Sequence, residues 1–313
     1  MIALKIVFLI FCIVLNVCFT SANQRISAKK CKEYESITQV PYYIRAHPSF
    51  PVNTVIEDKC QRNGIALVIG GKDAQLYEFP HQALLGYQKP GERKVKWACG
   101  GSLISPNFIL TAAHCLGSID TGPVRYVKLG IINRLESNVK IYNVIETFKH
   151  EGYDPQKNKN DIALLKLNEI VTFNEYIYPI CLPTQQYEES SAIATGFGRT
   201  AGENAASENL LKVTLEHFSF SKCQQLLNLK AETVFKDIMI CYGHLTQKKD
   251  TCKGDSGGPL QIYNDDISKC TYTQIGIVSF GPANCGTEGI PSVYVNVYHY
   301  LDWIEGIVWQ DEI

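Results

Sequence analysis

The sequence has little that would favour a metal site, a nucleic-acid partner or a membrane-embedded chain. Its formal net charge is −1, from 30 basic and 31 acidic residues among 313, so neither nucleic acid nor an anionic membrane is expected as the main partner. No two cysteines have the CxxC spacing of a zinc site, and we expect no metal and no cofactor. Beyond the N-terminus no apolar run approaches the roughly 20 residues that span a bilayer.

The first 22 residues have the pattern of a secretory signal peptide. Lys5 precedes an apolar stretch from Ile6 to Phe19, and Ser21 and Ala22 provide small residues for cleavage. The alternative, a membrane anchor, requires a longer apolar stretch. We therefore expect residues 1–22 to be removed and the protein to be secreted, extracellular and soluble.

Cysteine is abundant. Of twelve cysteines, Cys12 and Cys18 lie in the signal, and the remaining even number in an exported chain predicts five disulfides. Residues 23–67 form a polar prosegment that is too short to bury a core alone.

Residues 68–313 form the predicted main domain. Short apolar or alternating runs separated by turn residues predict an all-β fold. Helical spacing predicts helices over 221–229 and at the C-terminus over 298–309.

Three separated motifs carry the residue types of an activated serine. A serine hydroxyl is a weak nucleophile until a histidine accepts its proton and a carboxylate orients that histidine. The candidates are Ser256 in GDSGGP, His114 in TAAHC and Asp161 in NDIALL. Each alone has a structural interpretation, such as a buried histidine beside a disulfide. Their combination and order favour catalysis.

These motifs resemble those of chymotrypsin-like, trypsin-type serine endopeptidases. The resemblance implies two six-stranded antiparallel β-barrels with the active site in the cleft between them, followed by a C-terminal helix. It also implies that Ser256 attacks the scissile carbonyl, that His114 is the general base and then the general acid, and that Asp161 orients His114. The backbone N–H groups of Gly254 and Ser256 would form the oxyanion hole.

The same resemblance assigns substrate-binding residues. Asp250 would lie at the floor of the primary specificity pocket and select arginine or lysine, the alternative being a solvated aspartate in a lysine-rich loop. Ser279 and Gly281 match the strand that pairs with the substrate backbone. Ser292 stands where trypsin-like members commonly have glycine, and its hydroxymethyl group is expected to narrow the pocket.

A candidate activation site precedes the domain. Val68-Ile69-Gly70-Gly71 resembles the mature N-terminus of the family, the alternative being an ordinary glycine-rich turn. Cleavage between Leu67 and Val68 would free an α-amine that pairs with Asp255 and orders the oxyanion hole. Because Leu67 is not basic, the resemblance implies an upstream protease that accepts leucine, rather than self-activation.

The resemblance implies a set of disulfides as well. These are Cys99–Cys115, Cys223–Cys241, Cys252–Cys285 and Cys60–Cys181, of which the last would tether the prosegment. Cys31–Cys270 is then inferred by elimination. Ile131 offers no carboxylate where calcium-binding relatives have one, so we expect no calcium dependence.

The segments 25–34 and 66–71 resemble the linker and cut site of arthropod clip-domain cascade proteases of the snake type, although the six-cysteine clip module is absent. An extracellular cascade, protein substrates with arginine or lysine at the cleaved position, and serpin-type inhibitors are thereby implied. A digestive or venom trypsin is the alternative enzyme, disfavoured by Leu67 and the tethered prosegment. A non-catalytic protease-like cascade cofactor is the alternative from another class.

Overall fold

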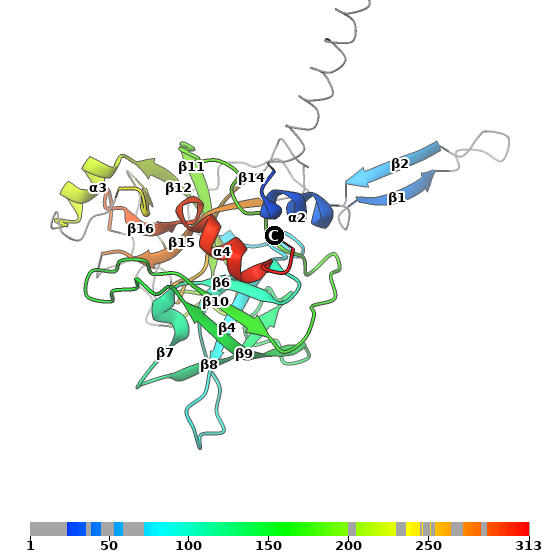
Figure 1. Ribbon diagram of the computed structural model, residues 1–313, viewed down its shortest axis with the longest axis horizontal. Helices are drawn as coiled ribbons and strands as arrows, with labels where there is room; N and C mark the ends of the chain where they lie inside the picture. Colours follow the sequence, from blue (N-terminus) through cyan, green and yellow to red (C-terminus); the bar gives the residue numbers. More distant parts are fainter. Residues whose placement is uncertain are drawn as a thin grey trace, which may run out of the picture.

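Two antiparallel sheets, each closed into a ring of six strands, make up most of the computed structural model (Figure 1). The structure describes residues 24–35, 39–44, 53–58, 72–199, 205–229, 236–244, 246, 251, 254–263, 272–282 and 287–312. The expected signal peptide, the Leu67–Val68 cut site and Asp250 lie outside the described residues. The predicted all-β class, the two barrels and the C-terminal helix are confirmed.

The first barrel pairs its strands in the order β4-β5-β6-β10-β9-β8, and β8 pairs with β4 to close the ring. The strands are β4 (Gln82–Tyr87), β5 (Lys96–Ser105), β6 (Phe108–Thr111), β8 (Gly122–Leu129), β9 (Ile141–Lys149) and β10 (Ala163–Leu167), with the short β7 (Gly117–Ser118) beside β8. Along β4 and β6 every residue is buried, because one face fills the barrel and the other is covered by neighbouring parts of the chain.

The second barrel follows the order β11-β14-β15-β16-β13-β12, and β11 pairs with β12. Its strands are β11 (Ser191–Gly196), β12 (Leu211–Phe218), β13 (Met239–Gly243), β14 (Pro259–Tyr263), β15 (Tyr272–Phe280) and β16 (Ser292–Asn296), with β3 (Lys72–Asp73) beside β12. Separate from both barrels, β1 (Gln39–Ile44) pairs with β2 (Asn53–Asp58).

Buried polar side chains join the two barrels. The Thr195 hydroxyl donates to Gln82 Oε1 at 2.7 Å, and the Ser102 hydroxyl donates to Gln274 Oε1 at 2.5 Å. His81 Nε2 lies 2.5 Å from Gln261 Oε1. All six side chains are buried, and buried polar groups are costly unless paired. This network therefore favours one relative placement of the barrels, and with it one geometry of the cleft.

The helical segments among the described residues are α2 (Ile26–Glu35), the 3₁₀ turns η1 (Ala113–Leu116) and η3 (Val297–Tyr300), α3 (Phe220–Leu226) and α4 (Leu301–Val308). The predicted C-terminal helix corresponds to η3 and α4, and the predicted 221–229 helix to α3. Among the described residues, no helix has both the length and the apolar character needed to cross a membrane.

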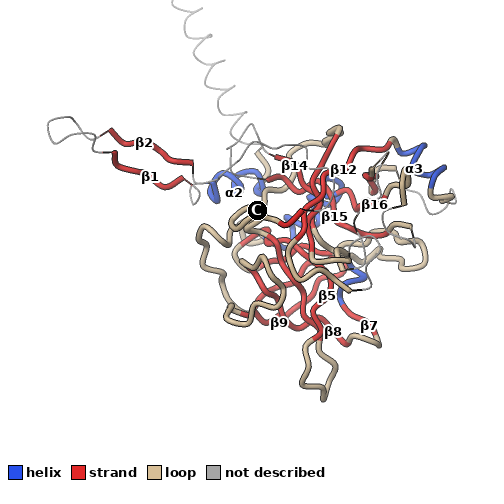
Figure 2. The backbone as a smooth tube through the Cα atoms, turned by 180° about the vertical axis from the view of Figure 1, so that it is seen from behind, coloured by secondary structure: helices blue, strands red, loops and turns tan. Residues whose placement is uncertain are grey.

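The N-terminal helix α2 lies against α4 (Figure 1), and Figure 2 shows α2 beside the C-terminal end of the chain. Glu305 of α4 is 7% exposed and accepts hydrogen bonds from the Ser27 N–H, the Ser27 hydroxyl and Arg25 Nη1. The Tyr34 ring packs edge-on against Phe173, with ring centroids 5.5 Å apart.

A disulfide between Cys31 of α2 and Cys181 fixes this helix to the segment that links the barrels. The expected pairs Cys60–Cys181 and Cys31–Cys270 are therefore wrong. The reason is the docking of α2, which buries Cys31 and brings its Cα within 5.1 Å of that of Cys181. Helix α2 is thus tethered to the barrels through Cys31, and not through Cys60 as expected.

Candidate active site

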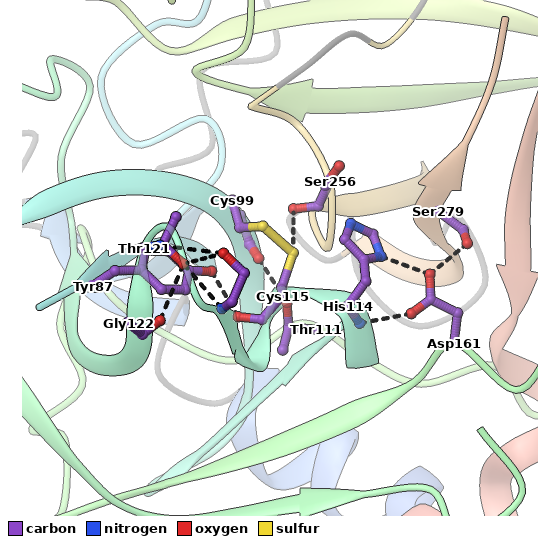
Figure 3. Close-up of a disulfide and its surroundings, with 12 residues drawn as sticks. Tyr87, Cys99, Thr111, His114, Cys115, Thr121, Gly122, Asp161, Ser256 and Ser279 are labelled. Atoms are coloured by element: carbon purple, nitrogen blue, oxygen red, sulfur yellow. Dashed lines mark hydrogen bonds and ion pairs between the residues drawn. A yellow bond between two sulfur atoms is a disulfide. The ribbon is translucent and has the colours of Figure 1, made fainter. Parts of the chain in front are cut away.

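His114 and Asp161 come together at the ends of two paired strands. His114 lies on η1 directly after β6, Asp161 lies two residues before β10, and Thr111 pairs with Ala163. His114 Nδ1 donates to Asp161 Oδ2 at 2.7 Å, and the His114 backbone N–H donates to Oδ1 at 2.9 Å (Figure 3). The Nδ1 bond fixes the tautomer with a proton on Nδ1, which leaves Nε2 able to accept a proton.

The Asp161 carboxylate is held in its charged form. It is 2% exposed, and the Ser279 hydroxyl from β15 of the other barrel donates to Oδ2 at 2.6 Å. Burial by itself would raise the pKa of Asp161, but the hydrogen bonds from His114 and Ser279 and the adjacent imidazole lower the pKa below its usual value.

The residue before Asp161, Asn160, is itself held in place by hydrogen bonds to Tyr300 and Gly152. Asn160 has a φ of 54°, which asparagine tolerates better than most residues. Its Oδ1 accepts a hydrogen bond from the Tyr300 hydroxyl at 2.7 Å, and its Nδ2 donates to Gly152 O at 2.8 Å. Sequence reasoning missed Tyr300, because nothing local connects η3 with a loop 140 positions earlier.

Ser256 lies in a tight turn at the edge of the second barrel. Gly254 and Gly257, on either side, have φ values of 112° and 78°, where a side chain would be strained. Gly100 N–H donates to Ser256 O at 2.8 Å, which joins the turn to β5 of the first barrel.

The imidazole of His114 lies between Ser256 and Asp161 (Figure 3). In this part of the described structure no direct hydrogen bond links Ser256 Oγ to His114 Nε2. Such bonds are often long in sites without substrate and shorten in the reacting complex.

Asp255 lies against the end of β11. Its Oδ1 accepts a hydrogen bond from Gly198 N–H at 2.7 Å. A Cβ atom at Gly196 or Gly198 would overlap the Asp255 carboxylate, so both glycines are needed for its position. Val68, the expected partner of Asp255, lies outside the described residues.

The expected substrate-binding residues that the structure describes lie together. Ser279 is on β15, and Gly281 follows that strand. Ser292 is 2% exposed at the start of β16. A Cβ atom at Gly281 would lie 2.2 Å from Ser292 Oγ, so the Ser292 hydroxyl fills the space beside Gly281. Asp250 lies outside the described residues.

The disulfide Cys99–Cys115 braces η1, and Cys223–Cys241 joins α3 to β13, as the resemblance implied. Cys252–Cys285 lies outside the described residues. Cys99, Cys115 and His114 place their ligand-type atoms within 4.8 Å of one another. The two sulfurs are bonded to each other and cannot act as thiolates, so this cluster does not fit a metal.

Comparison with known proteins gives the same family. Residues 68–304 match the family model described as Trypsin. Serine protease snk of Drosophila melanogaster is 34% identical over 296 residues, which cover 92% of this chain and 66% of that protein. Melanization protease 1 of the same species is 35% identical over 273 residues, which cover 80% of this chain and 67% of that protein. The phenoloxidase-activating enzyme of Bombyx mori is 33% identical over 334 aligned positions, which cover 94% of this chain and 74% of that protein.

The chain thus spans about two thirds of the length of the first two of these relatives. The family match extends over both barrels and includes His114, Asp161 and Ser256. The chain belongs to the trypsin family of chymotrypsin-like serine proteases.

Proposed function

We propose that the processed protein is a secreted serine endopeptidase that cleaves after arginine or lysine in an extracellular proteolytic cascade. The observation that carries the chemistry is the His114–Asp161 pair, in which Asp161 holds Nδ1–H and leaves Nε2 toward the Ser256 turn. The cascade role is supported by relatives whose names describe a melanization protease and a phenoloxidase-activating enzyme.

The proposed reaction has two halves. Ser256 Oγ attacks the scissile carbonyl carbon while its proton passes to His114 Nε2, and Asp161 stabilises the resulting imidazolium. The N–H groups of Gly254 and Ser256 donate to the oxyanion. His114 then gives its proton to the leaving amine. A water molecule, activated by the same histidine, hydrolyses the acyl-enzyme.

The preference for arginine or lysine rests on Asp250 as the pocket carboxylate. The contact between Ser292 and Gly281 supports a pocket narrower than one with glycine at position 292. Chromogenic peptides that differ only in the residue before the cleaved bond test this preference. We expect the arginyl and lysyl peptides to be cleaved at least about 100-fold faster than the phenylalanyl peptide. Faster cleavage of the phenylalanyl peptide would refute the role of Asp250.

We further propose that residues 1–22 are a signal peptide, that residues 23–67 are a prosegment and that the protease domain is 68–313. Cleavage after Leu67 by an upstream protease frees the Val68 amine to pair with Asp255, and serpin-type inhibitors end the activity. The Cys31–Cys181 disulfide supports a prosegment that stays attached. We expect N-terminal sequencing of the active form to give Val68, and electrophoresis to separate the prosegment only after reduction. Release without reductant would contradict the tether.

A further inference from the structure

The loop between β4 and β5, taken together with Lys96 at the start of β5 and called loop 88–96 below, has a strong excess of positive charge. It contains one acidic residue, Glu92, and four basic residues: Lys89, Arg93, Lys94 and Lys96. Arg93, Lys94 and Lys96 are exposed, and the loop extends from the lower edge of the first barrel in Figure 1. For a chain with a net charge of −1, this is a local concentration of charge that an anionic partner would recognise.

Hydrogen bonds at its base hold the loop in place. Gln88 Nε2 donates to Glu92 O at 2.9 Å, and the Tyr126 hydroxyl of β8 donates to Gln88 Oε1 at 2.8 Å. On the other side of the loop, Arg134 Nη2 donates to Trp97 O at 2.6 Å. The basic side chains are therefore presented from a fixed base, which lowers the entropic cost of binding.

The strand that leads out of this loop also contacts the nucleophile. On β5, Gly100 N–H donates to Ser256 O, and Cys99 is bonded to Cys115. In Figure 3 the disulfide lies on one side of Ser256 and Ser279 lies on the other. If the substrate segment before the scissile bond pairs with the strand of Ser279, as the sequence resemblance implies, the segment after that bond leaves across the disulfide toward the loop.

The distance along β5 fixes which substrate residues reach the loop. Lys96 lies four positions before Gly100 on β5, which corresponds to about 13 Å along the strand. An extended substrate advances by a similar length per residue. A substrate that leaves along β5 would therefore place about its fourth residue after the scissile bond level with Lys96, and its third to sixth residues within reach of the long side chains of Lys96, Lys94 and Arg93.

We propose that loop 88–96 binds an acidic segment of the protein substrate, located at the third to sixth residues after the cleaved bond. This inference rests on the proposed function and adds a preference that the primary pocket does not supply. A single exposed ion pair changes binding by a factor of about 1.4 to 5. Two or three such contacts of intermediate strength, about 2.5- to 3-fold each, give about a 5- to 30-fold preference at low salt.

The test uses the processed, disulfide-linked protein and three internally quenched peptides. All share one segment that ends in arginine before the scissile bond, and they carry Asp/Glu, Asn/Gln or Lys at the third to sixth positions after it. We expect kcat/KM to be about 5- to 30-fold higher for the acidic peptide than for the amide peptide. At 0.5 M salt, where charges are screened within a few ångströms, the ratio should fall below about two.

Charge reversal supplies the decisive comparison. The triple variant Arg93→Glu, Lys94→Glu, Lys96→Glu should reverse the preference, whereas Lys222→Glu on α3, also exposed, should leave it unchanged. Hydrolysis of a small arginyl nitroanilide, which has no residues after the bond, reports separately on the proposed function. Equal cleavage of acidic and amide peptides, or a preference that survives the triple variant, overturns the proposal. Binding of a sulfated glycan to the loop would not rescue it, because the proposal concerns the protein substrate.

Discussion

Replacing Glu305 by glutamine should weaken the packing of the N-terminal helix α2 against the rest of the chain, while the Cys31–Cys181 disulfide keeps it attached. Helix α2 has ten residues, too few to be stable alone in water, so it depends on its contacts. The Glu305 carboxylate accepts the Ser27 N–H, one of the donors that a helix start leaves unpaired, together with the Ser27 hydroxyl and Arg25 Nη1. A negative charge at this end of a helix is also favoured by the helix dipole.

The size of the effect follows from these contacts. Hydrogen bonds to a buried charged group contribute about 1.5–3 kcal/mol each and are not additive when they share one carboxylate. Glutamine removes the charge and replaces one carboxylate oxygen with an NH₂ group, which cannot accept a hydrogen bond from Ser27 or Arg25. We expect the local opening free energy of α2 to fall by about 2–3 kcal/mol, which corresponds to a roughly 30- to 150-fold loss of amide protection.

Hydrogen exchange followed by mass spectrometry measures this loss directly in the disulfide-intact protein. The matched control is Asp302→Asn on the same helix α4. Asp302 also binds Arg25, at 2.7 Å, but its side chain is 89% exposed, so its loss should reduce protection by at most about fivefold. Peptides from β4 should exchange equally in both variants. If the two substitutions had equal effects on α2, the buried carboxylate would not be its anchor.

Three further predictions concern the site and the barrel interface. Tyr300→Phe removes the donor to Asn160 and should lower kcat on a small arginyl substrate about five- to tenfold with KM unchanged; a shift in KM alone would argue against a positioning role. Gly254→Ala introduces strain at a φ of 112° and should lower kcat about 10²- to 10³-fold, whereas Gly91→Ala, at a φ of 84° in open space, should leave it unchanged. Burial lowers the pKa of His81 to about 3. Below about pH 6.5 the His81 side chain binds a proton in the unfolded chain but not in the folded chain, so the stability associated with neutral His81 should be fully present above that pH. It should decrease toward pH 3 by up to about 1.4 kcal/mol per unit. Urea unfolding of the parent and of His81→Gln at pH 6.5 and 5 should show a smaller loss in the variant, and equal losses would contradict this.

The sequence was sufficient to predict the parts of the site that lie in local motifs. The TAAHC and NDIALL segments end or begin strands, so His114 and Asp161 could be assigned before their pairing was visible. Ser279 was expected only as a substrate-binding residue, yet its hydroxyl also binds Asp161. The contribution of Tyr300 depends on how η3 packs against the Asn160 loop, which no local pattern encodes.

Cysteine pairing was the clearest failure. Cys60 was expected as the partner of Cys181 because the resemblance matches it to a cysteine that forms this bond, but a match in position does not determine connectivity among ten cysteines. The partner is Cys31, because Ala28, Cys31 and Tyr34 form a buried face of α2 and Glu305 anchors its first turn. That anchor lies 278 positions away from Ser27, beyond the range of any helix-capping rule.

The most direct test of the account is to locate the adduct of a fluorophosphonate probe by mass spectrometry. In the processed protein the probe should modify the Oγ of Ser256 stoichiometrically, and His114→Ala should abolish the labelling because no base then accepts the serine proton. Modification of a different serine, or undiminished labelling of Ser256 in His114→Ala, would contradict the proposed nucleophile and its activation.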